Sequence, residues 1–588
     1  MSAYKLLDLI NNVSDLKKLK IDQLQLLASD IRKYIIDTIS SIGGHIGGSL
    51  GVVELTIMLH YIFDSPKDKI IWDVGHQSYP HKILTGRKKK LQNVRKRQGI
   101  STFLSIKESE FDVFGAGHSS TSISAAMGIA VARNIKKENN DIIAVIGDGA
   151  LSAGMAFEAI NNLYKIQDKG IIVILNDNGM SISPSVGALD KHFKNINKDN
   201  IFTKLGLEYI GPIDGNDINQ LHKVLTKVKG KHKNVVIHCK TVKGKGFNNN
   251  IDDYENFHAV GKFNKDTLEP ILTNKKETYT DIAIKSLINI AETDNKVVAI
   301  TAAMESGTGL NKFSKKFPDR YFDVGIAEQH AVTCAGGMAI NGLKPYVAIY
   351  STFLQRAYDQ LLHDIAIQKL PVKFLIDRAG ITGEDGPTHA GSFDISYLIN
   401  IPNFIIMLPS DAQQLINMIY TSYFIDDNPC SIRYPKFTIN SNYNINDAQK
   451  LPIGKGRIIN QGNSDIAILS FGTCLEESKK ILDDYPNITI ADALFAKPLD
   501  VKLIENLVKQ HKILITIEEG VQCGAGALVM NEINKLNLLD HIKIFNLTLP
   551  DKFIQHDTIQ NIKSETNLDY PALLKLIDKI TKDHNIKL

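Results

Sequence analysis

The sequence predicts an α/β protein of three doubly wound domains with mainly parallel sheets. Short runs rich in isoleucine and valine recur along its 588 residues, each followed by a loop and a helix-like stretch. These runs are apolar almost throughout instead of alternating, which is typical of strands buried on both faces of a parallel sheet. Ligands bind at the carboxyl ends of such strands, so functional residues are expected in the loops that follow them.

The predicted strands and linkers divide the chain into three parts. The strands are expected at residues 142–146, 171–175, 297–300, 346–349, 373–376, 404–407, 465–469, 488–491 and 513–517. Two polar stretches, at about 266–280 and 439–450, interrupt this pattern and are interpreted as linkers. The expected domains are therefore 1–274, 275–445 and 446–588.

Composition and charge favour an ordinary globular protein and argue against several classes. Apolar residues make up 43% and charged residues 22% of the chain, and no apolar run reaches the ~20 residues that cross a bilayer. The N-terminal residues lack the apolar core of a secretory signal, so a cytoplasmic protein without membrane partners is expected. The basic residues at 87–90 and 95–97 are interpreted as a solvated helix face or loop, and not as a nucleic-acid site, because no aromatic residues interleave with them.

The strongest chemical motif is Gly147-Asp148-Gly149 after one predicted strand and Asn176-Asp177-Asn178 after the next. A helix is expected between them, at 152–166, so Asp148 and Asn176 emerge at neighbouring strand ends. A carboxylate and an amide beside glycines suit Mg²⁺ shared with a diphosphate, and the helix start near Ser152 would offer N–H groups to phosphate oxygens. Either motif alone would indicate only a turn; the pair closely resembles the thiamine-diphosphate motif.

A second motif, DVGIAEQH at 323–330, places Glu328 in the first turn of an expected helix. The simpler interpretation is a helix start, where glutamate interacts favourably with the helix dipole. Thiamine chemistry, however, needs a carboxyl group at the pyrimidine ring nitrogen, far from the metal. A metal motif in the first domain and a lone glutamate in the second therefore suit a cofactor that bridges two domains.

Histidines and arginines supply the remaining candidates. His45, His76 and His118 stand in glycine-rich loops, and His258 is a weaker fourth. A lone histidine is more often structural, but glycine lets a loop approach a ligand and imidazole moves protons near neutral pH. Several basic residues follow apolar strands in the second domain and favour a phosphorylated substrate, because arginine binds phosphate in a planar fork: Arg356, Arg378, His389 and Arg433.

These segments together resemble the 1-deoxy-D-xylulose-5-phosphate synthase family over nearly the whole chain. The most specific stretches are WDVGHQSYPHKILTGR, GHSSTSIS, GDGALSAGMAFEA, NDNGMSIS, PDRYFDVGIAEQHAVT and IDRAGITGEDGPTHAGSFD. The resemblance implies a transketolase-like fold, thiamine diphosphate and Mg²⁺ as cofactors, and a homodimer. It implies a transferase that decarboxylates pyruvate and condenses the two-carbon unit with D-glyceraldehyde 3-phosphate, giving 1-deoxy-D-xylulose 5-phosphate and CO₂ as the first step of the methylerythritol phosphate route to isoprenoids.

The same resemblance implies individual roles. Asp148 and Asn176 would ligate Mg²⁺, and Glu328 would activate the cofactor. The other implied cofactor contacts are His76, Gly117, His118, Ser119, Gly149, Ala150, Phe247 and Phe353, with Asn176 among them. Those implied at the reaction centre are His45, Tyr350, Asp385 and His389, and those implied for the sugar phosphate are Arg356, Arg378 and Arg433.

Two alternatives stay open at this point. A transketolase, or a pyruvate dehydrogenase component, would share the cofactor motifs, although transketolase lacks this string of segments in this order. A non-catalytic relative that kept the fold is the alternative from another class, and the intact set of Asp148, Asn176 and Glu328 argues against it. The sequence also departs from the family around Phe103 and by a short connection at 181–206.

Overall fold

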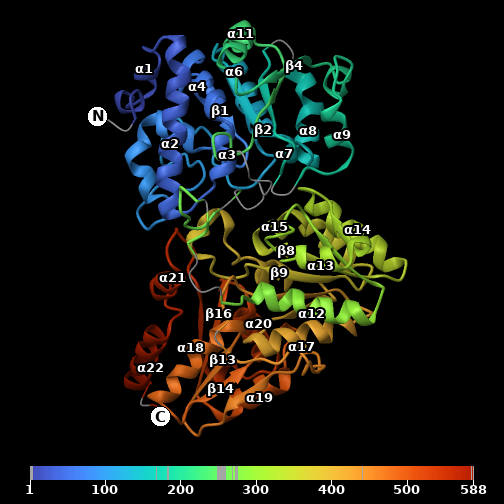
Figure 1. The fold of residues 1–588 in the computed structure, drawn as a ribbon. Helices are drawn as coiled ribbons and strands as arrows, with labels where there is room; N and C mark the ends of the chain where they lie inside the picture. The colour runs from blue at the N-terminus through green and yellow to red at the C-terminus, as the bar shows by residue number, and fades with distance from the viewer. Residues whose placement is uncertain are drawn as a thin grey trace. The chain divides into compact units, whose positions relative to one another are not determined.

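The computed structural model consists of two compact units, Met1–Asn274 with Gly325–Ala327, and Lys275–Val324 with Glu328–Leu588 (Figure 1). Within them the structure describes residues 4–166, 169–181, 184–247, 258, 260–267, 269–271, 276–439, 441–584 and 586. One sheet lies in the first unit and two lie in the second. The predicted α/β class is confirmed, whereas the expected boundary at 274/275 lies outside the described residues.

The sheet of the first unit is parallel throughout, with strand order β1-β2-β3-β5-β4. Its strands are β1 (Lys69–Trp72), β2 (Ile142–Gly147), β3 (Ile172–Asp177), β4 (Glu208–Asp214) and β5 (Val235–Lys240). Because side chains alternate along a strand, Ile143 and Val145 of β2 enter one core while Ala144 and Ile146 enter the other. The sheet is therefore covered on both faces, as the apolar runs predicted.

Helices from different parts of the first unit cover the two faces. The core on one face contains α2 (Leu24–Ile42), α4 (Val53–Ile62) and α11 (Ile218–Val228), and the core on the other contains α6 (Ser122–Lys136) and α8 (Gly154–Asn162). The sheet therefore lies between two layers of helices. The carboxyl ends of β2 and β3 lie at one edge of it, and the GDG and NDN motifs follow these strand ends.

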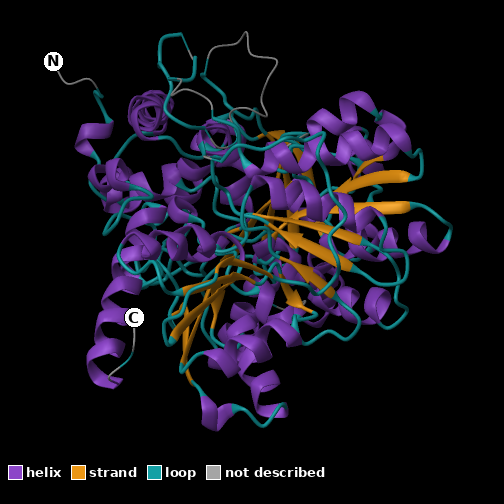
Figure 2. Cartoon of the chain, turned by 90° about the horizontal axis from the view of Figure 1, so that it is seen from below, coloured by secondary structure: helices purple, strands orange, loops and turns teal. Residues whose placement is uncertain are grey.

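The second unit contains two mainly parallel sheets (Figure 2). The larger has the order β15-β10-β11-β9-β8-β6-β7, from β6 (Val297–Thr301), β7 (Tyr321–Asp323), β8 (Lys344–Tyr350), β9 (Lys373–Asp377), β10 (Ile405–Met407), β11 (Cys430–Arg433) and the antiparallel β15 (Phe495–Lys497). The smaller has the order β12-β14-β13-β16-β17, from β12 (Arg457–Asn460), β13 (Ile466–Ser470), β14 (Thr489–Asp492), β16 (Ile513–Val521) and β17 (Lys543–Leu549). One hydrophobic core combines residues of both sheets, such as Ile376 and Leu469, so the two sheets are packed as one body.

Two details differ from the sequence prediction. The helix expected at 152–166 starts two residues later: α7 (Asp148–Leu151) is one turn, Ala153 is extended, and α8 starts at Gly154. The expected linker at 266–280 ends early, because Thr278 and Asp281 form a capping box that starts α12 at Tyr279. None of the helices in the described part of the chain is long and apolar enough to cross a bilayer.

Candidate active site

Asp148 and Asn176 lie at adjacent strand ends, as predicted. Asn176 is paired in register with Gly147, the residue before Asp148. The Asp148 carboxylate is buried and accepts a hydrogen bond from Ser185 Oγ at 2.7 Å, and burial raises its pKa to about 6. Asn176 Oδ1 accepts from Thr241 Oγ1 at 2.6 Å, which leaves it a second lone pair. Hard oxygen atoms of this kind are the ligands that Mg²⁺ prefers.

The GDG turn is packed tightly against two other loops. A Cβ atom at Gly149 would stand 2.6 Å from Ser181 Cβ, so only glycine fits there. The carbonyl of Ala150 accepts a hydrogen bond from Ser120 Oγ at 2.7 Å, which joins the turn to the loop that carries Gly117, His118 and Ser119. No group of three or more His, Cys, Asp and Glu side chains forms a metal site among the described residues. A cation here would therefore need oxygens from a diphosphate, the main chain or water beside Asp148 and Asn176.

Three histidines come together from separate loops of the first unit. The His258 ring lies 5.5 Å from the ring of His45 and 5.3 Å from that of His76. A Cβ atom at Gly48 would stand 2.5 Å from His76 Cδ2, which explains a glycine in this loop. Burial lowers the pKa of His76 to about 4 and that of His258 well below its ordinary value, so both rings are neutral at pH 7. Among the described residues, Nδ1 of His76 and of His258 has no hydrogen-bond partner.

The other candidates of the first unit have simpler surroundings. Phe247 is buried and packs edge-on against Phe263, with ring centres 5.5 Å apart. His118 and Ser119 are half-buried, and Gly117 has a φ of 146°. The structure therefore groups His76 with His45 and His258 and ties the loop of His118 to Ala150.

In the second unit, Glu328 is the first residue of α14 (Glu328–Ile340) and is buried. Burial raises the pKa of its carboxyl group, and the nearby charge of Arg356 opposes this shift. A buried glutamate with a raised pKa can hold a proton near neutral pH, which is what exchange with a ring nitrogen requires. The predicted position at a helix start is confirmed.

A stack of four side chains stands near the ends of β8 and β9. Tyr350 and Phe353 are stacked at 5.6 Å, and His389 lies edge-on to Phe353 at 5.5 Å. The Arg378 guanidinium lies 4.0 Å from the centre of the Tyr350 ring and donates to the carbonyl of Gly307 at 2.8 Å. The structure thus brings together four side chains that the sequence analysis expected in one site: Tyr350, Phe353, Arg378 and His389.

The loop at 380–391, which carries Asp385 and His389, is held by the smaller sheet's part of the unit. Gly380 and Gly391 pair through their backbones at 2.6 and 3.1 Å. A Cβ atom at Gly391 would stand 1.9 Å from the Arg378 carbonyl oxygen. His556 Nδ1 donates to the carbonyl of Glu384 at 2.9 Å, and Asp385 forms an ion pair with Lys436 at 2.7 Å. Glycines and contacts from far along the chain therefore shape this loop.

The three arginines expected at the sugar phosphate differ in their surroundings. Arg433 is buried and its Nε donates to Asp394 at 2.8 Å, while its Nη2 donates to the carbonyl of Gly391 at 3.2 Å. These bonds tie Arg433 to loop 380–391, so it supports that loop instead of presenting a fork to solvent. Arg356 is half-buried beside Glu328, and Arg378 is engaged by Tyr350.

Sequence reasoning missed two supporting residues of the first unit. Asp73 accepts hydrogen bonds from the backbone N–H groups of Ser120 and Ser122 at 2.6 and 3.0 Å, and so fixes the loop after His118. Lys243 is buried and donates to the Ser181 carbonyl at 3.0 Å, beside the GDG turn. Asp73 occurs in the quoted stretch WDVGHQSYPHKILTGR and Lys243 lies just before Phe247, but nothing local in the sequence pairs them with these partners.

Three family models match the chain. The model described as 1-deoxy-D-xylulose-5-phosphate synthase matches residues 7–204 and 191–241. The transketolase pyrimidine binding domain matches residues 275–440, and the transketolase C-terminal domain matches residues 454–572.

Individual proteins and solved structures were also compared with the chain. A curated 1-deoxy-D-xylulose-5-phosphate synthase from Methylobacillus flagellatus is 46% identical over 618 residues, which covers 98% of this chain and 99% of the relative. Among solved structures, a split-gene transketolase chain described as an inactive β4 tetramer is 22% identical, covers 52% of this chain and 98% of its own, and has a TM-score of 0.47. A transketolase from Campylobacter jejuni is 17% identical, covers 95% of this chain and all of its own, and has a TM-score of 0.42.

Proposed function

The chain belongs to the 1-deoxy-D-xylulose-5-phosphate synthase family, and from this premise we propose that it is a thiamine-diphosphate-dependent transferase. Its substrates are pyruvate and D-glyceraldehyde 3-phosphate, and its products are 1-deoxy-D-xylulose 5-phosphate and CO₂. The observation that carries the proposal is the 46% identity over nearly the full length of a relative with that name. The arrangement of the candidate residues in each unit supports it.

Cofactor binding is assigned to both units. In the first, Asp148 and Asn176 would hold Mg²⁺, because a buried carboxylate and an amide oxygen stand at paired strand ends. The loops of Gly117, His118, Ser119 and Gly149, with Ala150, His76 and Phe247, would surround the diphosphate and ring. In the second unit, Phe353 would pack on the ring and Glu328 would exchange a proton with its nitrogen.

Electrostatics suit these roles. When bound, thiamine diphosphate supplies a nucleophilic carbon and an electron sink for loss of CO₂ from a 2-oxo acid. A Mg²⁺ ion beside Asp148 would keep that carboxyl ionised despite its raised pKa. Burial raises the pKa of the Glu328 carboxyl group, which favours proton exchange with the pyrimidine ring.

The second-unit side chains would handle the substrates. His389 and Asp385, with Tyr350, would position the acceptor and move protons at its hydroxyl groups, as would His45 and its neighbours in the first unit. Arg356 and Arg378 would bind the phosphate, chiefly fixing the orientation of the sugar. Arg433 is assigned to loop support because its Nε donates to Asp394 and its Nη2 donates to the carbonyl of Gly391. The family resemblance further leads us to expect a cytoplasmic homodimer with the domain limits 1–274, 275–445 and 446–588.

Product analysis tests the proposed activity. The purified protein is incubated with thiamine diphosphate, Mg²⁺, pyruvate labelled at its carboxyl carbon, and D-glyceraldehyde 3-phosphate. We expect labelled CO₂ and a five-carbon deoxysugar phosphate, identified by mass. A transketolase would release no CO₂ from pyruvate, and a pyruvate dehydrogenase component would form no sugar phosphate; either result would overturn the proposal.

A further inference from the structure

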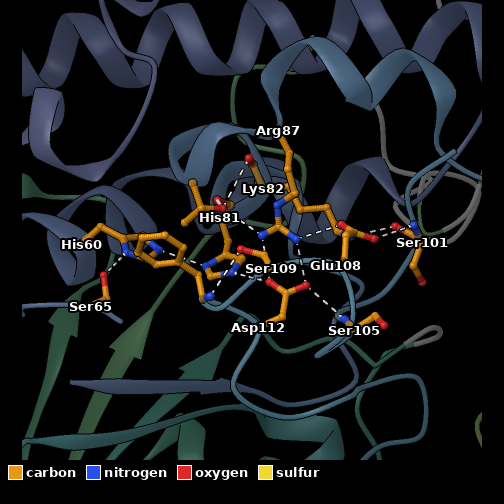
Figure 3. Close-up of polar contacts among 12 residues, drawn as sticks. His60, Ser65, His81, Lys82, Arg87, Ser101, Ser105, Glu108, Ser109 and Asp112 are labelled. Atoms are coloured by element: carbon orange, nitrogen blue, oxygen red, sulfur yellow. Dashed lines mark hydrogen bonds and ion pairs between the residues drawn. The ribbon is translucent and has the colours of Figure 1, made fainter. Parts of the chain in front are cut away.

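A buried chain of polar side chains lies in the first unit, away from the residues assigned above (Figure 3). We call it the buried charge network, and its members are Ser65, His60, His81, Asp112, Arg87, Glu108 and Lys82. His60 contacts Ser65 Oγ at 2.8 Å and His81 at 2.9 Å, and His81 Nε2 contacts Asp112 at 3.0 Å. Arg87 holds Asp112 with two bonds of 2.8 Å and Glu108 with one of 2.8 Å, and Lys82 contacts Glu108 at 2.6 Å.

The network corrects the interpretation of the basic run. Arg87 was expected on a solvated face, but it is 4% exposed and forms a two-pronged ion pair with Asp112. Lys89 and Lys90 are exposed, as expected. The network holds two cations, Lys82 and Arg87, and two carboxylates, so its charges balance. A set whose charges balance in this way tolerates burial, whereas loss of one member leaves an uncompensated charge.

The donor and acceptor of each hydrogen bond from Ser65 to Asp112 can be assigned. Although burial raises the pKa of Asp112, bonds from His81 and Arg87 hold it well below its ordinary value, so the carboxylate is ionised. His81 Nε2 must then donate to it, and His81 Nδ1 must accept from His60 Nε2. His60 Nδ1 in turn accepts from Ser65. Both rings are therefore neutral, in agreement with the way burial lowers the pKa of each.

The network fixes both ends of a short stretch of irregular backbone. Glu108 Oε2 accepts from the backbone N–H of Ser101 at 2.8 Å, and Asp112 Oδ2 accepts from that of Ser105 at 3.0 Å. Lys82 also donates to the Ser101 carbonyl at 2.8 Å. The residues between, 102–104, have no helix or strand of their own. Their conformation therefore depends on side chains that come from outside the stretch.

Phe103 stands at the centre of this stretch and touches the candidate site. Its ring lies 5.4 Å from the ring of His45, and it is 4% exposed. A Cβ atom at Gly75, next to His76, would lie 3.5 Å from Phe103 Cβ. The Leu104 carbonyl accepts from the N–H of Ala116, just before Gly117. The stretch thus packs against three loops that carry candidate residues.

We propose that Asp112 and Glu108 are positioning residues: through the buried charge network they press Phe103 against His45 and so hold that imidazole for the reaction. This inference rests on the proposed function, since His45 is a candidate of that site. The contacts described above connect the network to the His45 ring through Phe103, so we expect its effect on turnover to pass through that ring.

A double-mutant cycle tests this coupling. Asp112→Asn and Phe103→Ala are made singly and together, and kcat, KM and thiamine diphosphate affinity are measured. We expect each single variant to lower kcat by about 10- to 100-fold, the loss that a displaced group causes, with cofactor affinity within about threefold. The double variant should be no slower than the slower single variant, because both changes remove one interaction. If the fold-losses in kcat of the two single variants multiplied in the double variant, the proposal would be overturned.

Two further variants separate positioning from folding. Asp68 is a buried carboxylate of the same unit that accepts from the N–H groups of Asp64 and Asp141 at 2.7 and 2.8 Å, at the start of β1. Asp68→Asn should lower thermal stability but leave kcat within about twofold. If Asp112→Asn fails to fold, Glu108→Gln takes its place in the cycle. A loss of kcat equal to that of Asp68→Asn would show a purely structural role and would contradict the proposal.

Hydrogen exchange gives a readout that needs no activity. In the protein without cofactor, Asp112→Asn should speed amide exchange in peptides covering 101–116, while Asp68→Asn should not. Unchanged exchange there would overturn the positioning role. If the wild-type protein makes no deoxysugar phosphate but amide exchange responds as expected, the proposed function is wrong, whereas the role of the network in holding Phe103 is supported. If the wild-type protein is active but the effects of Asp112→Asn and Phe103→Ala on kcat multiply, only the positioning role is wrong.

Discussion

Segment 101–116 in the first unit and loop 380–391 in the second both lie against candidate active-site side chains, but different forces hold them. Ion pairs among Lys82, Arg87, Glu108 and Asp112 fix the first. The second has polar contacts with Arg433, Lys436 and His556, but its glycines also approach backbone and side chains too closely for a Cβ atom. The first should therefore be sensitive to charge and pH, and the second to side-chain volume.

The largest expected effect comes from adding one methyl group to loop 380–391. In Gly391→Ala the new Cβ would stand 1.9 Å from the Arg378 carbonyl oxygen, so backbone must move. A displacement of this size should lower turnover by about 100-fold or more. Turnover of the purified variant measures this.

Gly337→Ala is the matched control for that change. Gly337 lies in α14 with nothing within 4 Å of its added Cβ, and it is exposed. Alanine is favoured over glycine in a helix, so this variant should be as active and at least as stable as the wild type. If both variants lost the same turnover, close packing at Gly391 would not be what fixes loop 380–391.

Removing one charge of the buried network should come next. Asp112→Asn leaves Arg87 buried without its two-pronged partner, which should lower the free energy of unfolding by about 3 to 5 kcal/mol. Trp72 is the single tryptophan of the chain and is buried in the first unit, so its fluorescence during urea unfolding reports on this unit.

An exposed ion pair of the same unit provides the comparison. Asp64 pairs with Lys17 at 2.6 Å and Lys229 at 2.9 Å on the surface. Asp64→Asn should cost less than about 1 kcal/mol, because solvent screens such pairs. If both variants lost the same stability, burial of the network would not matter to its strength.

A pH effect should be smaller and confined to acid. Burial lowers the pKa of His60 and His81. Below about pH 6.5 these two histidines therefore bind more protons in the unfolded chain than in the folded unit. The contribution of these two histidines to the free energy of unfolding should therefore be constant above that pH and fall as the pH drops. His60→Gln should reduce the slope of the free energy of unfolding with pH. His76 and His258 leave part of the slope in place, since their pKa values are lowered too. A slope unchanged by His60→Gln would contradict the neutral state of the network.

Local patterns in the sequence predicted most of the fold and the strand ends and helix start at which the main candidate residues lie. Runs such as 142–146 are buried on both faces, and adjacent strand ends brought Asp148 and Asn176 together because parallel strands end at one edge. The burial of Arg87 could not be predicted, because its partner Asp112 lies 25 residues away in a polar stretch without secondary structure. The close packing of Gly149 against Ser181 could not be predicted either, because the two residues belong to different loops. Side-chain pairs across long separations, unlike strand periodicity, leave no local signal.

A calorimetric comparison of Asp148→Asn and Glu328→Ala tests the central proposal, in which Asp148 serves the Mg²⁺-dependent binding of thiamine diphosphate and Glu328 serves its activation. Titration of thiamine diphosphate with and without Mg²⁺ measures binding, and turnover is measured on the same samples. We expect Asp148→Asn to abolish the Mg²⁺-dependent gain in affinity. Glu328→Ala should retain that gain and lose turnover. Wild-type turnover in Glu328→Ala, or an unchanged Mg²⁺ effect in Asp148→Asn, would contradict the account.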